Sequence, residues 1–90
     1  MTSLLVHYAG HVQGVGFRYS VKQLAAGFEV TGQVRNLSDG RVELQVQGER
    51  EEVEAFLAAL RESSLRHYIH EEKLSPVPRD LAATGFHIGH

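Results

Sequence analysis

The sequence of 90 residues contains no cysteine, only two prolines and no long apolar run. Without cysteine, disulfide bridges and thiolate metal sites are excluded. Small secreted domains usually depend on disulfides, so their absence favours a reducing compartment, and we expect a cytoplasmic protein. No segment approaches the ~18 apolar residues that a membrane span needs. The apolar run 4–6 is too short for a signal peptide.

The sequence also lacks an excess of positive charge, because its formal net charge is −2. A nucleic-acid-binding domain usually carries a basic excess or stripe, so we expect no nucleic-acid partner. Residues 1–48 carry four basic and three acidic side chains, whereas residues 49–90 carry five basic and eight acidic ones. Residues 1–28 hold no carboxylate side chain at all. A small anion therefore meets least repulsion in this first segment.

The length predicts one domain spanning residues 1–90, since domains run from roughly 50 to 250 residues. There are no internal repeats, low-complexity tracts or linkers. The charged surface favours a monomer.

Hydrophobic periodicity predicts alternating strands and helices. In chain order we expect a strand over 4–9, a helix over 17–26, strands over 28–35 and 41–47, a helix over 50–62, a polar strand over 66–74 and a short strand over 85–88. Gly27 is expected to end the first helix in the left-handed conformation. Pro76 and Pro78 are expected to confine the polar strand to a sheet edge.

This order predicts an α+β fold of the ferredoxin-like (βαββαβ) kind, with two helices on one face of an antiparallel sheet of four to five strands. Such a fold does not by itself indicate a function.

The most informative segment joins the first strand to the first helix, and it reads Gly10-His11-Val12-Gln13-Gly14-Val15-Gly16-Phe17-Arg18. Its glycines let the backbone curl so that successive N–H groups point inward and form a concavity for an anion. The helix start adds unpaired N–H groups, and Arg18 can donate two hydrogen bonds to two phosphate oxygens. Neither a P-loop nor a dinucleotide fingerprint matches. Spacing alone equally allows an ordinary glycine-rich connection.

Asn36 is a second candidate, because it closes the second strand just before the turn Ser38-Asp39-Gly40. Spacing alone favours a turn-forming asparagine. The alternative is a carboxamide that holds a water molecule by donating and accepting hydrogen bonds.

Together these segments resemble the acylphosphatase family. Residues 10–18 match its signature Gly-x-Val-Gln-Gly-Val-x-Phe-Arg, and Asn36 falls where the family has its catalytic asparagine. The resemblance is close over residues 4–62 and weaker afterwards. It implies hydrolysis of acyl phosphates to a carboxylate and inorganic phosphate, with Arg18 and Asn36 as the catalytic residues. The substrate-binding loop would comprise His11, Val12, Gln13, Gly14, Val15, Gly16 and Phe17 together with Arg18, and no metal or other cofactor is implied.

The sequence departs from the family at three places. Gln33 stands at a position that is often aromatic, Ser63-Ser64 replaces a Gly-Pro pair, and the strand expected near 66–74 is unusually polar. We expect these differences to affect stability and rate rather than reaction class.

The sequence also bears on three other functions. A ferredoxin-like module that binds a phosphate group without hydrolysing it would share the same loop. RNA recognition needs aromatic side chains on the middle strands, and the outward positions of 41–47 hold only Arg41, Glu43, Gln45 and Gln47. Metal binding is disfavoured because His67 and His70, like His87 and His90, would point to opposite faces of a strand.

Overall fold

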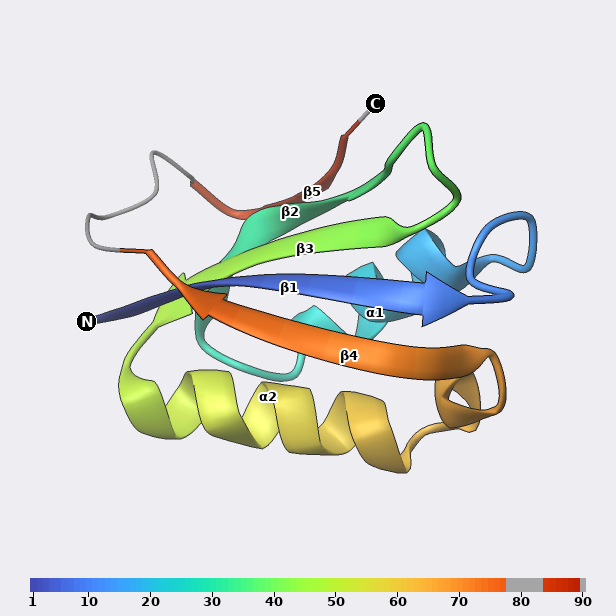
Figure 1. Ribbon diagram of the computed structural model, residues 1–90. Helices are drawn as coiled ribbons and strands as arrows, with labels where there is room; N and C mark the ends of the chain where they lie inside the picture. The colour runs from blue at the N-terminus through green and yellow to red at the C-terminus, as the bar shows by residue number, and fades with distance from the viewer. Residues whose placement is uncertain (78–83, 90) are drawn as a thin grey trace.

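The computed structural model describes residues 1–77 and 84–89. It contains a five-stranded sheet with the strand order β4-β1-β3-β2-β5 (Figure 1). The elements are β1 (Thr2–Gly10), α1 (Phe17–Ala25), β2 (Val30–Asn36), β3 (Val42–Gly48), α2 (Arg50–Glu62), the 3₁₀ helix η1 (Ser64–His67), β4 (Ile69–Pro76) and β5 (Phe86–Ile88). The predicted ferredoxin-like α+β fold is confirmed.

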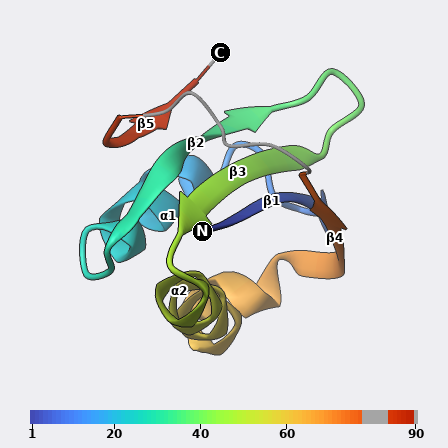
Figure 2. The same ribbon diagram turned by 90° about the vertical axis from the view of Figure 1, so that its left-hand side faces the viewer.

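Both helices cover the same face of the sheet, as Figure 2 shows. The apolar positions of β3, which are Val42, Leu44 and Val46, are fully buried. On the helix that packs against these strands, Phe56 and Leu60 of α2 are fully buried as well. The period of two in the strands and the i, i+3, i+4, i+7 pattern in α2 therefore meet in one core.

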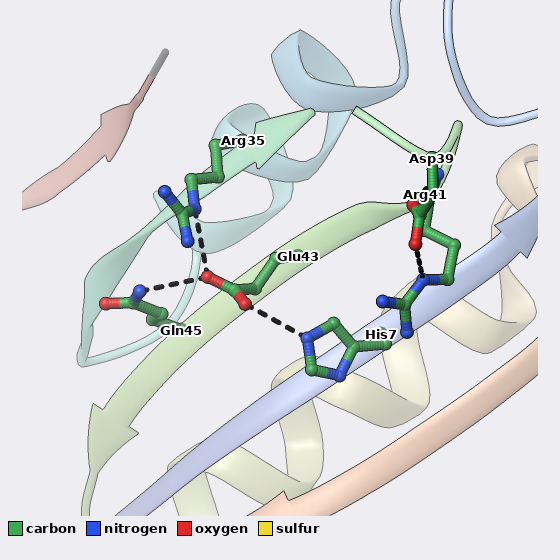
Figure 3. Close-up of polar contacts among 6 residues, drawn as sticks. All are labelled: His7, Arg35, Asp39, Arg41, Glu43 and Gln45. Atoms are coloured by element: carbon green, nitrogen blue, oxygen red, sulfur yellow. Dashed lines mark hydrogen bonds and ion pairs between the residues drawn. The ribbon is translucent and has the colours of Figure 1, made fainter. Parts of the chain in front are cut away.

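The opposite face of the sheet is polar and has Glu43 at its centre (Figure 3). Glu43 lies on β3 and is buried although no helix covers this face. Its carboxylate accepts hydrogen bonds from His7 of β1 at 3.0 Å, from Arg35 of β2 at 3.0 Å and from Gln45 at 3.1 Å. A network of polar side chains thus joins three neighbouring strands. No aromatic side chain of β3 faces outward here, as the sequence predicted.

The strand predicted over 66–74 is partly wrong, because residues 64–67 form η1 and β4 begins only at Ile69. The Ser63 hydroxyl accepts a hydrogen bond from the N–H of Leu65 at 3.2 Å and so caps the 3₁₀ turn. The Leu65 side chain is buried and anchors the same turn to the core. β4 does lie at a sheet edge, as predicted, but it continues to Pro76, two residues beyond the predicted end. Pro78 lies outside the described residues.

The sheet is mixed and not wholly antiparallel, because β5 pairs with β2 in parallel. Gly48 of β3 lies opposite both Thr2 and Val30, so β1 and β2 begin at the same end of the sheet. β4 runs antiparallel to β1 and therefore finishes at this end. β5 also starts at this end of the sheet. It therefore runs in the same direction as β2 and pairs with it in parallel.

The left-handed conformation predicted for Gly27 is wrong, because its φ is not positive. Helix α1 instead ends through Ala26 in a right-handed conformation, followed by hydrogen bonds from Gly27 N to Leu24 O and from Phe28 N to Ala25 O. These tight i→i−3 bonds satisfy the last carbonyl groups without a glycine cap. No helix of the described residues is long and apolar enough to cross a membrane.

Candidate active site

The loop between β1 and α1 owes its shape to two glycines in the left-handed conformation. Gly14 has φ 79° and Gly16 has φ 76°, values that other residues adopt only at a cost. Backbone N–H groups in such a curled segment turn toward a common centre. The loop thus has the local geometry expected of an anion site.

Helix α1 starts at this loop with an open N-terminus. Its first intrahelical hydrogen bond runs from Ser20 N to Gly16 O at 3.0 Å, so the N–H groups of Phe17, Arg18 and Tyr19 have no partner within the helix. No side chain caps this end, and no acidic residue lies in the first turn. These unpaired N–H groups and the helix dipole favour a bound anion.

The loop between β1 and α1, the start of α1 and Asn36 all line one cavity of about 160 Å³. A cavity of this volume has room for several water-sized groups. Its described lining consists of Val12, Gly14, Gly16, Phe17, Arg18, Tyr19, Asn36 and Ile88. This described lining holds one cation, Arg18, and no carboxylate side chain, so its charged groups attract an anion.

Asn36 contributes an unusual group to this cavity. Its side-chain Oδ1 is buried and has no hydrogen-bond partner among the described residues. A buried acceptor without a partner is costly, and natural proteins rarely leave one unused. Asn36 therefore carries an acceptor that no described residue uses, and it is one of the residues that line the cavity.

Arg18 is held at the cavity by the C-terminal strand. A guanidinium nitrogen of Arg18 lies 3.5 Å from the carbonyl oxygen of Gly89, which directly follows β5. Gly89 is fixed in turn by a hydrogen bond from its N–H to Val34 O of β2 at 2.8 Å. One long hydrogen bond occupies one of five guanidinium N–H donors, so the others remain able to bind an anion.

The structure brings together most of the residues that the sequence singled out. Arg18, Asn36 and four residues of the loop line the cavity, whereas His11, Gln13 and Val15 do not. The backbone N–H of His11 donates to Tyr68 O at 2.9 Å and its ring packs against His70, so this N–H is not free for a ligand.

Sequence reasoning missed Tyr19 and Ile88 as lining residues. Tyr19 could have been found from its place in the first turn of α1, next to Arg18. Ile88 carried no local signal, because it reaches the site only through the pairing of β5 with β2.

No three histidine, cysteine, aspartate or glutamate side chains within residues 1–77 and 84–89 are grouped so that they could hold a metal ion. His67 lies in η1, so its predicted place on a strand is wrong. His90 lies outside the described residues.

The fold and the cavity define a ferredoxin-like domain with a cavity at the start of its first helix, lined by Arg18 and by no carboxylate among the described residues. A family model for acylphosphatases matches residues 4–88. An acylphosphatase of Bacillus pumilus is 40% identical over 78 residues, which cover 82% of this chain and 87% of the relative. The crystal structure of acylphosphatase from Bacillus subtilis matches 100% of both chains with a TM-score of 0.89 at 29% identity. The structure of an acylphosphatase from Coxiella burnetii matches 98% of this chain and 92% of that protein's chain, with a TM-score of 0.80 at 32% identity.

The chain belongs to the acylphosphatase family. Acylphosphatases are hydrolases that act on acid anhydrides, and the family implies a small-molecule acyl phosphate as substrate.

Proposed function

We propose that this protein hydrolyses acyl phosphates without a metal ion, with Arg18 and the loop N–H groups binding the phosphoryl group and Asn36 orienting the attacking water. One observation carries this assignment of roles. Asn36, whose Oδ1 has no partner among the described residues, lines the same cavity as Arg18 and the open N-terminus of α1, and the described lining holds no carboxylate.

The reaction needs little acid–base chemistry, because the carboxylate of an acyl phosphate is already a good leaving group. Catalysis of phosphoryl transfer consists mainly of positioning and electrostatic stabilisation. Arg18 and the N–H groups would offset the charge on the phosphoryl oxygens. Asn36 Oδ1 would accept a hydrogen bond from the water and aim its oxygen at phosphorus.

The bonds and protons balance without an enzyme base. The water oxygen forms a bond to phosphorus, and the bond from phosphorus to the acyl oxygen breaks to release the carboxylate. A carboxamide is a poor base, and the described lining of the cavity contains no carboxylate. The water proton therefore passes to a phosphoryl oxygen, and the second product is inorganic phosphate.

The proposal that no metal ion is needed rests on the side chains that line the same cavity. Mg²⁺ and related ions prefer several oxygen ligands, usually including carboxylates. The side chains that line the cavity in the described part of the chain offer one carboxamide, the phenol of Tyr19 and a guanidinium. The guanidinium and the backbone N–H groups supply the positive potential that a metal ion supplies elsewhere.

The test follows hydrolysis of benzoyl phosphate by ultraviolet absorbance, in the presence of EDTA. Wild-type protein is expected to turn the substrate over. Arg18→Ala should lose about 10²- to 10³-fold or more in kcat and most phosphate affinity, since a preorganised donor has been removed. Asn36→Ala should lower kcat by a similar factor while phosphate still binds. Arg66→Ala serves as the control, because Arg66 donates to Glu62 O on the exposed surface of η1.

Each departure from this pattern has a defined meaning. Loss of activity in EDTA that returns with Mg²⁺ would overturn metal independence. Loss of phosphate binding in Asn36→Ala would make Asn36 a binding or structural residue. Folded wild-type protein that binds phosphate without hydrolysing benzoyl phosphate would be a non-catalytic binding module.

A further inference from the structure

The side chain of Gln13 links two segments that are far apart in the sequence. Its carboxamide nitrogen Nε2 donates to Leu37 O at 2.8 Å and to Arg41 O at 2.9 Å. Both N–H bonds of the amide are thus used on the turn between β2 and β3. Figure 1 shows this turn beside the β1–α1 loop at the same end of the sheet.

The turn that accepts these bonds is itself closed by hydrogen bonds. Leu37 N donates to Arg41 O at 2.8 Å, and Gly40 N donates to Leu37 O at 3.2 Å. The carboxylate of Asp39 accepts from the backbone N–H of Arg41 at 3.0 Å and from its guanidinium at 2.9 Å (Figure 3). Gln13 is therefore attached to an ordered turn rather than to a single loose carbonyl.

Each end of the Gln13 link is adjacent to a part of the proposed site. Leu37 directly follows Asn36, whose Oδ1 would hold the water. Gln13 itself lies between Val12 and Gly14, which line the cavity that would hold the phosphoryl group. In the proposed site, the distance between the water and the phosphorus atom would thus depend on how the loop is placed against the turn.

We infer that Gln13 is a positioning residue, which sets the phosphate-binding loop in register with Asn36. This inference rests on the proposed function. Phosphate binding needs only the loop, Arg18 and the helix start, whereas attack needs the water of Asn36 aligned with the phosphoryl group. Loss of the link should therefore reduce turnover far more than substrate affinity. Misplacement of reacting groups by about 1 Å can cost about 100-fold in rate.

The first experiment measures kcat and KM for benzoyl phosphate with Gln13→Ala and Gln13→Glu. Gln13→Ala is expected to lower kcat by about 10- to 100-fold with KM changed less than about threefold. Gln13→Glu keeps the size but cannot donate and would set a carboxylate against two carbonyl oxygens, so its kcat at pH 7 should be at least as low. Gln23→Ala, at an exposed glutamine on α1 outside the cavity, is the matched control and should retain wild-type kcat.

A second measurement detects the link without turnover. In ¹⁵N-labelled wild-type protein, inorganic phosphate should shift the backbone signals of Gly14 and Gly16 and also the side-chain amide signals of Asn36. In Gln13→Ala the glycine signals should still shift, with a phosphate Kd within about threefold of wild type, while the response of Asn36 should fall by at least half. Gln23→Ala should respond as wild type does.

The two proposals fail in different ways. Absence of hydrolysis by the wild-type protein would refute the proposed function, and the phosphate titration would then decide alone on Gln13. The positioning role is overturned if Gln13→Ala keeps kcat within twofold of wild type. It is also overturned if KM rises as much as kcat falls, if Gln23→Ala loses as much activity, or if Asn36 responds to phosphate unchanged.

Discussion

Three buried polar atoms among the described residues have no hydrogen-bond partner: the hydroxyl of Tyr8, Oε2 of Glu72 and Oδ1 of Asn36. Burial raises the pKa of Tyr8, and the neighbouring negative charge of Glu72 raises it further. The side chains of Tyr8 and Glu72 therefore lie close to each other. Asn36 differs because it lines a cavity beside a guanidinium. Its unpartnered oxygen therefore belongs to a residue of the candidate site and not of the apolar core.

Replacing Arg18 by lysine tests whether its planar shape matters as well as its charge. Arginine can donate two parallel hydrogen bonds to two phosphate oxygens, whereas a lysine ammonium acts as a single point charge. We expect Arg18→Lys to lower kcat/KM for benzoyl phosphate by about 100-fold. The steady-state rate is the measurement, with circular dichroism to check the fold. A kcat/KM close to that of the wild type in the lysine variant would contradict two parallel hydrogen bonds from Arg18 to the phosphate oxygens.

At the residue scale, the places of Arg18 and Asn36 at the cavity were easier to predict than the supporting contacts. Arg18 was singled out by a local order of glycines and a helix start. Asn36 was singled out by the resemblance to the acylphosphatase family, since its spacing alone favoured a turn-forming residue. The side-chain contact of Gln13 was not predictable, because its two acceptors lie 24 and 28 residues away and depend on how the hairpin turn meets the loop.

Strand β2 depends on a glycine at a position where a side chain has no space. Gly32 has φ +151°, and a Cβ atom added there would lie 1.8 Å from Gln45 O of β3. Gly40 also has a positive φ, of +96°, but a Cβ atom there would meet open space. We expect Gly40→Ala to cost about 1–2 kcal/mol and Gly32→Ala about 3 kcal/mol or more, since the second adds a backbone clash.

Urea unfolding measures this difference as a lower midpoint at an unchanged slope. Equal losses in the two variants would mean that strand pairing relaxes around the new methyl group. A larger loss in Gly40→Ala would contradict the argument from space altogether.

Elements with strong periodicity were predicted well, and elements shaped by distant contacts were not. The hairpin of β2 and β3 and helix α2 appear at nearly their predicted ranges, because each alternates or repeats over several turns. η1 was missed because a serine cap and the burial of Leu65 override the local preference. The direction of β5 was missed because it follows from where β4 ends, which no local pattern records.

At the scale of the whole molecule, the two faces of the sheet differ in the side chains that they carry. The face beneath the helices holds the apolar core, and the cavity lies where α1 begins. On the other face, Glu43 joins β1, β2 and β3 through His7 and Arg35 (Figure 3). Burial tends to raise the pKa of Glu43, but the hydrogen bonds from His7, Gln45 and Arg35 outweigh burial and hold the pKa below its ordinary value of 4.5.

This lowered pKa makes the fold sensitive to acid in a predictable direction. As the pH falls, the unfolded chain binds the proton of this glutamate first, near its ordinary pKa, so protonation favours unfolding. The stability contributed by Glu43 is present above this pH and is lost as the pH falls through the folded-state value. Glu43→Gln should therefore destabilise the protein at pH 7, by about 1–2 kcal/mol, and much less at pH 3.

Urea unfolding of both proteins at a series of pH values from 7 to 3 checks this expectation. Glu54→Gln is a suitable control, because Glu54 forms an exposed ion pair with Arg50 on α2, and such pairs contribute little. The difference between wild type and Glu43→Gln should shrink steadily with acid, while the control difference stays small throughout. A difference for Glu43→Gln that is the same at pH 3 and pH 7 would show that the side chain stabilises the sheet through packing, independently of its charge.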